Sequence, residues 1–176
     1  MTPELTLETL IARIAPLDQA AMQLARARQD TLTKPRGALG RLEAISVWLA
    51  GVYATERPVI TGKAVIVCAG DHGVTVEGIS LYPSAVTPAM VANLLAGGAG
   101  INAIAQTVGA TVTVLDVGVA SDLEPHPRLV IAKVRRGTGN LMREAAMTKA
   151  EALQALLAGA AANGKRQTHY PTTLAG

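Results

Sequence analysis

At 176 residues, the chain has the length of one ordinary domain and is long enough to bury a hydrophobic core. Its composition is 49% hydrophobic but only 2% aromatic, with no Phe, so the core must consist of Ala, Val, Leu and Ile. A net charge of +3, without aromatic residues interleaved among the cations, argues against a nucleic-acid-binding protein. The single cysteine excludes an internal disulfide and fits a cytoplasmic protein.

The first third of the chain predicts a helical subdomain. It begins without the basic and apolar regions of a secretory signal, and no apolar run in the chain approaches the length of a membrane span. Apolar side chains recur at helical spacing between residues 4 and 30, where Pro16 separates two helices. A loop at 33–40 leads into a third helix at about 41–54, and a turn-rich connector follows at 55–62.

The rest of the chain alternates strands with helices, a pattern typical of a parallel sheet. Apolar runs predict buried strands at 63–69 and 111–118 and a third, short strand at 129–134. Helices are predicted at about 86–96 and 98–108, with Gly97 and Gly98 between them.

A capping box opens the last predicted helix. Thr148 stands at the N-cap with Glu151 three residues on, and the helix runs to about residue 162. The segment 163–176 is polar and aperiodic, so we expect a disordered tail there. The predicted organisation is a helical segment at 1–55, an α/β core at 56–162 and an atypical tail at 163–176.

The segment that follows the first strand, residues 69–83, reads AGDHGVTVEGISLYP. Ligands bind at the carboxyl ends of strands in open α/β sheets, and the glycines of this segment let the backbone approach a ligand closely. Asp71 and His72 suit acid–base chemistry. Alternatively, Asp71 accepts hydrogen bonds from backbone donors in a tight turn and His72 packs beneath it. The other two histidines lack metal-ligand spacing with His72, so no metal site is predicted.

Three further glycine-containing segments are candidates for phosphate binding. The segment 97–102 could present a helix N-terminus to a phosphate or form a tight turn between helices. Lys34 and Arg36 flank a bend that could hold a phosphate or carboxylate, or they belong to a solvated loop. The loop 137–140 gives a similar but weaker indication through Gly137, Thr138 and Asn140.

Together these segments resemble the nicotinate-nucleotide–dimethylbenzimidazole phosphoribosyltransferase family. The resemblance extends over residues 5 to about 160, and its most specific block is 69–83. The other matching blocks, in order and at approximately the expected spacing, are 33–43, 86–91, 97–102, 115–119, 137–140 and 146–148.

The resemblance implies a Rossmann-like, mostly parallel sheet with flanking helices and a small helical subdomain, in a homodimer. It also implies transfer of phosphoribosyl from nicotinate mononucleotide to 5,6-dimethylbenzimidazole in cobalamin biosynthesis, with these small molecules as the partners and no cofactor, nucleic acid or membrane. By analogy, Asp71 and His72 lie at the strand end facing the site and Glu77 shapes the loop. The walls of the base pocket would be Ser80, Tyr82, Val86 and Met90.

The chain departs from the family in its length. Family members are about twice as long, and their second half carries a GEMGIGN-type loop and the glutamate that acts as base. No catalytic residue is therefore assigned here, and we expect a truncated chain with little activity alone. Two other functions stay open: a noncatalytic module that binds benzimidazole or a nucleotide, and an unrelated α/β enzyme that uses Asp71 or His72.

Overall fold

The computed structural model of the chain describes residues 5–167, with side chains described to residue 162. It divides into two compact units, which are described separately. Among the described residues, 8–61 form a helical unit, and 62–167 together with 5–7 form the α/β unit.

The helical unit is built on two helices that pack against each other, α2 (Gln19–Thr31) and α3 (Arg41–Tyr53). A short helix, α1 (Leu7–Ala12), precedes them. Asp18 caps α2, because its side chain accepts a 2.9 Å hydrogen bond from the N–H of Ala21. The predicted helices are therefore confirmed, including the break that Pro16 imposes.

Small side chains allow α2 and α3 to approach closely. Ala25 on α2 and Ala50 on α3 are buried in their contact, together with Val47. A Cβ atom added at Gly51 would lie 2.7 Å from Cγ of Met22. The core of this unit is thus built from short aliphatic residues, as the scarcity of aromatic residues predicts.

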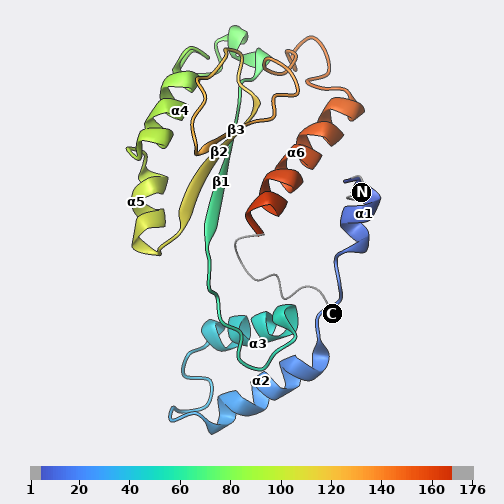
Figure 1. The fold of residues 1–176 in the computed structure, drawn as a ribbon, viewed down its shortest axis with the longest axis vertical. Coiled ribbons are helices and arrows are strands. Elements are labelled where there is room, and N and C mark those ends of the chain that lie inside the picture. The colour runs from blue at the N-terminus through green and yellow to red at the C-terminus, as the bar shows by residue number, and fades with distance from the viewer. Residues whose placement is uncertain (1–4, 168–176) are drawn as a thin grey trace. The chain divides into compact units, whose positions relative to one another are not determined.

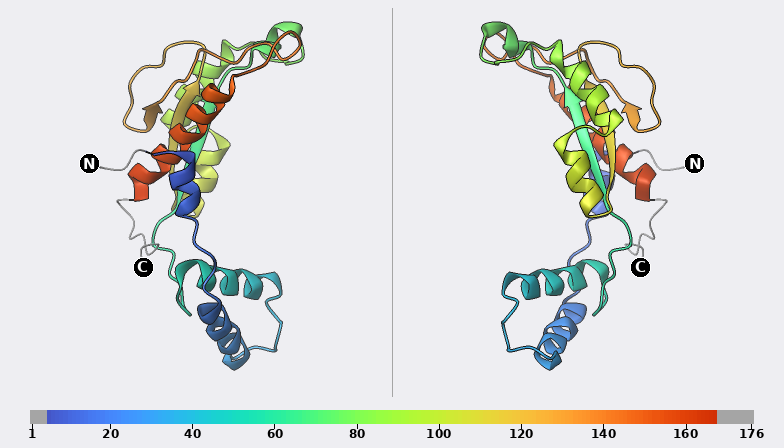
Figure 2. Two further views of the ribbon diagram at one scale, coloured as in Figure 1. Left: turned by 90° about the vertical axis from the view of Figure 1, so that its right-hand side faces the viewer. Right: turned by 90° about the vertical axis from the view of Figure 1, so that its left-hand side faces the viewer.

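The α/β unit contains a three-stranded parallel sheet in the order β1 (Ala64–Gly70), β2 (Thr111–Gly118), β3 (Leu129–Ile131). Figures 1 and 2 show α4 (Val86–Ala96) and α5 (Gly100–Thr107) on one face of the sheet and α6 (Lys149–Gln167) on the other. The predicted α/β class and parallel strand direction are confirmed.

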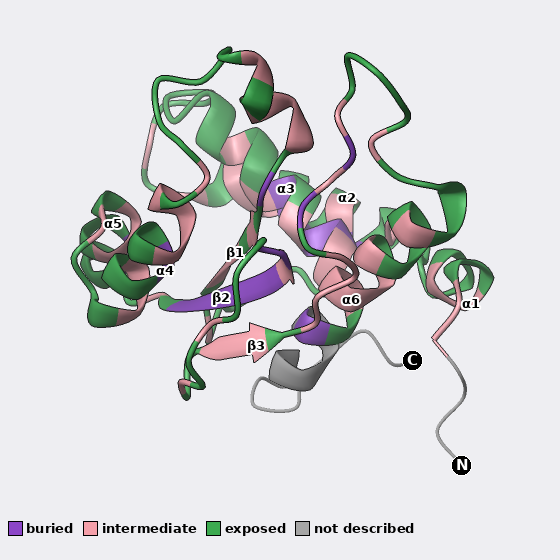
Figure 3. Ribbon diagram, turned by 90° about the horizontal axis from the view of Figure 1, so that it is seen from above, coloured by how far each residue is buried: buried purple, intermediate pink, exposed green. Residues whose placement is uncertain are grey.

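The two long strands differ in burial, which corrects one prediction. β2 is almost wholly buried, with Val114 and Leu115 at 1% and 0% exposure, whereas no residue of β1 is buried (Figure 3). β2 is the central strand, with a neighbour on each side. β1 pairs only with β2, so it lies at an edge of the sheet, where an apolar sequence does not ensure burial.

Two element boundaries differ from prediction, and one element was not predicted. β3 ends at Ile131, because its ladder with β2 stops where Ile131 faces Asp116. A 3-10 helix, η1 (Gly73–Glu77), was not predicted. α6 continues to Gln167, because no proline interrupts the chain between its start and residue 170. The rest of the expected tail, residues 168–176, lies outside the described residues.

The segment Val86–Thr107 is long and apolar enough to cross a membrane by length and composition, contrary to the prediction that no run approaches that length. The structure divides it at Gly97, which has a φ of 88° and ends α4. The two resulting helices contact β1 and β2, and each buries a residue, Val91 in α4 and Ala105 in α5. In the structure this segment therefore covers a face of the sheet.

Candidate functional site

A cavity of about 270 Å³ lies at the carboxyl ends of β1 and β2. Its walls come from residues 68–72 at the end of β1, from Val117 and Gly118 of β2, from the loop 134–138 and from Ala155 of α6. Sequence reasoning placed a ligand site at the end of the first strand, and the structure places a cavity there.

Asp71 is buried at the rim of this cavity, and both of its carboxylate oxygens already accept hydrogen bonds. Oδ1 accepts from the hydroxyl of Thr87 at 2.6 Å, and Oδ2 accepts from the N–H of Ala120 at 2.7 Å. The carboxylate therefore links the end of β1 to α4 and to the segment after β2. This arrangement suits a positioning residue better than a proton carrier.

His72 is exposed and contributes to the cavity wall. This contradicts the interpretation in which His72 packs beneath Asp71. His72 lies in extended backbone, with φ −120° and ψ 121°, immediately before η1.

The backbone of Gly73 lies against the loop 137–140. Its N–H donates to Oγ1 of Thr138 at 3.2 Å, and the N–H of Thr138 donates to the carbonyl of Asp71 at 2.9 Å. A Cβ atom at residue 73 would lie 2.5 Å from the carbonyl oxygen of Thr138, so only glycine fits. Asp71, His72, Gly137 and Thr138, which the sequence analysis selected separately, thus line one cavity.

Glu77 anchors η1 to the same loop. Its Oε1 accepts a 2.6 Å hydrogen bond from the side-chain amide of Asn140 and lies 2.9 Å from a guanidinium nitrogen of Arg143. Asn140 therefore supports the side chain of Glu77, and Asn140 itself does not line the cavity.

The four residues expected to wall a base pocket lie outside this cavity. Tyr82 and Met90 are 68% and 50% exposed, and Ser80 is also exposed. Ser80 stabilises its own loop, because its hydroxyl donates to the carbonyl of Tyr82 at 2.9 Å. Val86 is half-buried at the start of α4.

Sequence reasoning gave no role to a buried ion pair below the cavity. Asp116 is 0% exposed, and its Oδ2 lies 2.8 Å from Nζ of Lys133. Its Oδ1 accepts hydrogen bonds from the N–H groups of Gly118 and Val119, at 3.1 and 2.9 Å. The sequence did carry a signal for this ion pair, namely an aspartate at the end of an apolar strand. When such a strand is central, its carboxylate is buried and needs hydrogen-bonding or charged partners.

Arg135 also lines the cavity and was not selected from the sequence. Its guanidinium lies 3.5 Å from Oε1 of Glu151, at the start of α6. Glu151 and Thr148 form the predicted capping box, in which Thr148 N–H donates to Glu151 at 2.7 Å and Glu151 N–H donates to Thr148 at 3.2 Å. The hydrogen bonds that the N–H and the hydroxyl of Thr148 donate to the carboxylate, more than the nearby Arg135, hold the pKa of Glu151 below its usual value.

The two cations predicted for phosphate binding belong to the helical unit and are paired with carboxylates. Nζ of Lys34 lies 2.7 Å from Oε1 of Glu43, and Nε of Arg36 lies 3.7 Å from Oδ1 of Asp30. The hydrogen bond from Lys34, followed by that from the N–H of Leu39, lowers the pKa of Glu43.

The segment 97–102 forms the tight turn that was one of its two interpretations. The side chain of Asn102 accepts from the N–H of Ala99 at 3.1 Å and donates to the carbonyl of Leu94 at 3.1 Å. Across residues 5–167, no three His, Cys, Asp or Glu side chains are grouped so that they could hold a metal ion.

Comparison with known proteins shows which family this chain resembles. A family model described as phosphoribosyltransferase, DBI_PRT, matches residues 14–175. The chain is 58% identical over 161 residues to the nicotinate-nucleotide–dimethylbenzimidazole phosphoribosyltransferase of Deinococcus radiodurans, a match that covers 88% of this chain and 44% of that protein. A protein of the same name from Roseiflexus is 55% identical over 155 residues, with the same coverage.

Solved structures give the same result. The crystal structure of CobT from Thermus thermophilus matches with a TM-score of 0.83 and 46% sequence identity, over 87% of this chain and 46% of that one. A second structure from the same organism, titled as the nicotinate-nucleotide–dimethylbenzimidazole phosphoribosyltransferase, matches with a TM-score of 0.85 at 46% identity, over 89% of this chain and 47% of that one. The chain thus spans less than half the length of these relatives.

Proposed function

The chain belongs to the DBI_PRT phosphoribosyltransferase family, and from that premise we propose that the protein transfers phosphoribosyl from nicotinate mononucleotide to 5,6-dimethylbenzimidazole. The observation that carries the proposal is the strand-end cavity beside the block 69–83, in a chain 58% identical to a relative named for this reaction. With a volume of about 270 Å³, the cavity is slightly smaller than the usual range for small-molecule sites, about 300–1,000 Å³.

The proposed reaction exchanges one carbon–nitrogen bond for another. The bond between the ribose C1′ and the pyridinium nitrogen breaks, and nicotinate leaves as a neutral pyridine ring with both bonding electrons. The unprotonated nitrogen of the benzimidazole forms the new bond to C1′, and the N–H on its other nitrogen loses a proton. The leaving group needs no acid, so the protein's tasks are to position the two rings and accept that proton.

In this proposal the residues of the chain position the substrates. Both carboxylate oxygens of Asp71 already accept hydrogen bonds, from Thr87 and Ala120, so we assign it to holding the loop. The contact between Gly73 and Thr138 fixes the cavity wall, which His72 and Arg135 also line.

We further propose that the exposed side chains at the rim form one wall for the planar base. Leu81 and Tyr82 are 95% and 68% exposed, and Met90 of α4 is 50% exposed. Exposed apolar side chains of this kind suit a flat, largely apolar ring. Ser80 and Val86 are assigned to the same wall, and Glu77 and Asn140 to shaping it.

The proposal is tested by separating binding from turnover on the full chain. Dimethylbenzimidazole is titrated by calorimetry, and nicotinate release from nicotinate mononucleotide is followed by chromatography with and without the base. Because the chain spans 44% of the length of its relatives, we expect binding with little release. Binding without any release supports the binding-module alternative, and a folded chain that binds neither substrate contradicts the proposal.

A matched pair of variants localises the base. Met90→Ala removes an exposed side chain assigned to the wall, whereas Ile104→Ala removes a similarly exposed side chain, 64% accessible, from α5. We expect only the first to weaken dimethylbenzimidazole binding. Equal effects of the two variants would contradict the assigned wall. The homodimer and the cytoplasmic location stay predictions, of which light scattering on the purified chain tests the first.

A further inference from the structure

The helical unit contains a second cavity, which the proposed reaction does not use. This cavity, the arginine groove, has a volume of about 660 Å³ and lies between α2, α3 and the connector that follows α3. It is lined by charged and polar side chains from Arg28, Gln29, Ser46, Glu56 and Arg57 and by apolar ones from Leu49, Pro58 and Val59.

A hydrogen-bonded bridge between the two helices forms the floor of the groove. The amide of Gln29 on α2 donates to the hydroxyl of Ser46 on α3 at 2.7 Å, and that hydroxyl donates to the carbonyl of Glu43 at 2.8 Å. The buried Ala25 also lines the groove. The bridge fixes the spacing of the two helices, so the groove is preformed.

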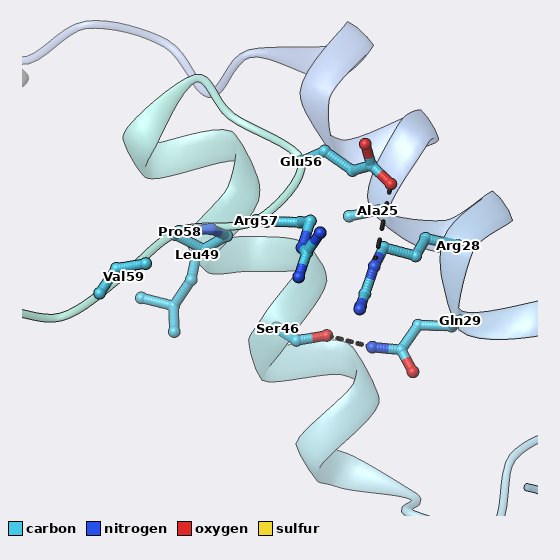
Figure 4. Close-up of a pocket in the computed structure, with 9 residues that line it drawn as sticks. All are labelled: Ala25, Arg28, Gln29, Ser46, Leu49, Glu56, Arg57, Pro58 and Val59. Carbon is cyan, nitrogen blue, oxygen red and sulfur yellow. Dashed lines mark hydrogen bonds and ion pairs between the residues drawn. The ribbon is translucent and has the colours of Figure 1, made fainter. Parts of the chain in front are cut away.

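Two guanidinium groups point into the space above this floor. Figure 4 shows the side chains of Arg28, from α2, and Arg57, from the connector, with their terminal nitrogens directed into the groove that both line. Two like charges that line one groove repel each other, and an anion bound there would reduce the repulsion.

The groove holds one carboxylate, which is poorly placed to neutralise both cations. Oε1 of Glu56 lies 4.0 Å from Nε of Arg28, at the outer limit of an ion pair, and does not engage the terminal nitrogens. Within residues 5–167, no hydrogen bond or ion pair joins Arg57 to another side chain or to the backbone. The charged lining therefore carries one excess positive charge and several unused N–H donors.

The opposite side of the groove is apolar. In Figure 4, Leu49, Pro58 and Val59 lie together to one side of Arg57, away from the Gln29–Ser46 bridge. A bare inorganic anion would engage only the basic end, whereas a ligand with an apolar body would contact both. The groove thus has complementary ends for one amphiphilic molecule.

We propose that the arginine groove binds a small organic oxyanion, a carboxylate or a phosphate ester on an apolar ring. The oxyanion is held between the guanidinium groups of Arg28 and Arg57, which form paired hydrogen bonds to such groups. The ring lies against Leu49, Pro58 and Val59. The proposal does not depend on the transferase reaction, because every residue it uses belongs to the helical unit.

Calorimetric titration of the full chain with benzoate, phenyl phosphate and inorganic phosphate tests the proposal, with amide and arginine NMR shifts locating the bound probe. Benzoate and phenyl phosphate represent the two oxyanions, and inorganic phosphate lacks the ring. We expect the better ring-bearing probe to bind more tightly than inorganic phosphate and to weaken as salt is raised from about 50 to about 300 mM, conditions under which exposed charges are increasingly screened.

Charge variants distinguish ligand binding from structural effects. Arg57→Gln should weaken the better probe by about tenfold, since a charge-assisted hydrogen bond is lost. Glu56→Gln should tighten it, because the competing carboxylate is removed. Arg26→Gln is the matched control, because Arg26 lies on α2 two residues from Arg28 and does not line the groove.

Two outcomes would overturn the proposal. One is the absence of binding by all three probes at millimolar concentration to a chain whose circular dichroism shows it folded. The other is binding that Arg57→Gln and Arg26→Gln weaken equally, which would indicate attraction to the net positive charge alone.

Discussion

Replacing Gly73 by alanine tests the close backbone contact between η1 and the loop 137–140 beside the strand-end cavity. The added Cβ would lie 2.5 Å from the carbonyl oxygen of Thr138 and 2.8 Å from the carbonyl carbon of Gly139. Both obstacles are backbone atoms, so neither can rotate away. Gly73 is not among the glycines with positive φ, and the effect of the substitution is therefore steric alone.

The expected cost follows from two contributions. Overpacking of this kind costs about 1–3 kcal/mol. Separating the segments also weakens the hydrogen bonds from Gly73 N–H to Thr138 Oγ1 and from Thr138 N–H to Asp71 O, each worth about 0.5–1.5 kcal/mol. We therefore expect Gly73→Ala to lower the free energy of unfolding by about 2–6 kcal/mol, a large part of the roughly 5–15 kcal/mol typical of a domain.

Urea unfolding followed by circular dichroism measures this change, and amide hydrogen exchange shows whether residues 137–140 lose protection. Gly159→Ala is the matched control. Gly159 lies inside α6 with no atom within 4 Å of an added Cβ, so alanine should stabilise the chain by about 0.5–1 kcal/mol. If Gly73→Ala unfolds within about 0.5 kcal/mol of the unmodified chain, the size of a neutral surface substitution, the inferred close contact is absent.

Three further substitutions test other parts of the α/β unit. Thr87→Val removes the hydroxyl that donates to buried Asp71 and should lower the free energy of urea unfolding by about 1–3 kcal/mol. If the two groups are coupled, adding Thr87→Val to Asp71→Asn should lower that free energy little further. Lys133→Met leaves the carboxylate of Asp116 buried without its cation and should lower the free energy of unfolding by about 3–5 kcal/mol. The control is Lys63→Met, at an exposed position. If thermal unfolding shows that Lys133→Met destabilises the chain less than Lys63→Met does, the buried pair is refuted. The pKa of Glu151 is lowered in the folded chain, so its contribution to stability is present above the usual value of 4.5 and is lost as the pH falls through the lower folded value. Glu151→Gln should therefore flatten the acid side of the profile of stability against pH, and an unchanged profile would contradict that sign.

The ion pair of Arg136 with Asp122 is exposed, and its contribution to stability is expected to be small. Both oxygens of Asp122 accept from Nη2 of Arg136, at 2.7 and 2.8 Å, and the arginine lowers the pKa of that carboxyl. Both side chains are largely exposed, so water and salt screen the pair and its removal is expected to change stability little.

Local patterns in the sequence were enough to predict the α-helices, the strands and the parallel sheet, but not the 3-10 helix η1. The positions of Pro16, Gly97 and the Thr148 capping box each act within a few residues of themselves, and the structure places helix ends at all three. Likewise, an apolar strand that ends in polar residues predicts a ligand site wherever parallel strands share an edge. These inferences need only the periodicity of the apolar residues and the residue types that end helices and strands.

The partners of each functional group depended on tertiary structure. Asp71 is held by Ala120, 49 residues away, and Gly73 by Thr138, 65 residues away, and no local pattern encodes such a pairing. The same holds for Arg28 and Arg57, which line one groove between elements that are separated in the sequence. Even the exposure of β1 followed from its place at the edge of the sheet. Periodicity specifies which face of an element is apolar, whereas strand order and helix packing decide what that face meets.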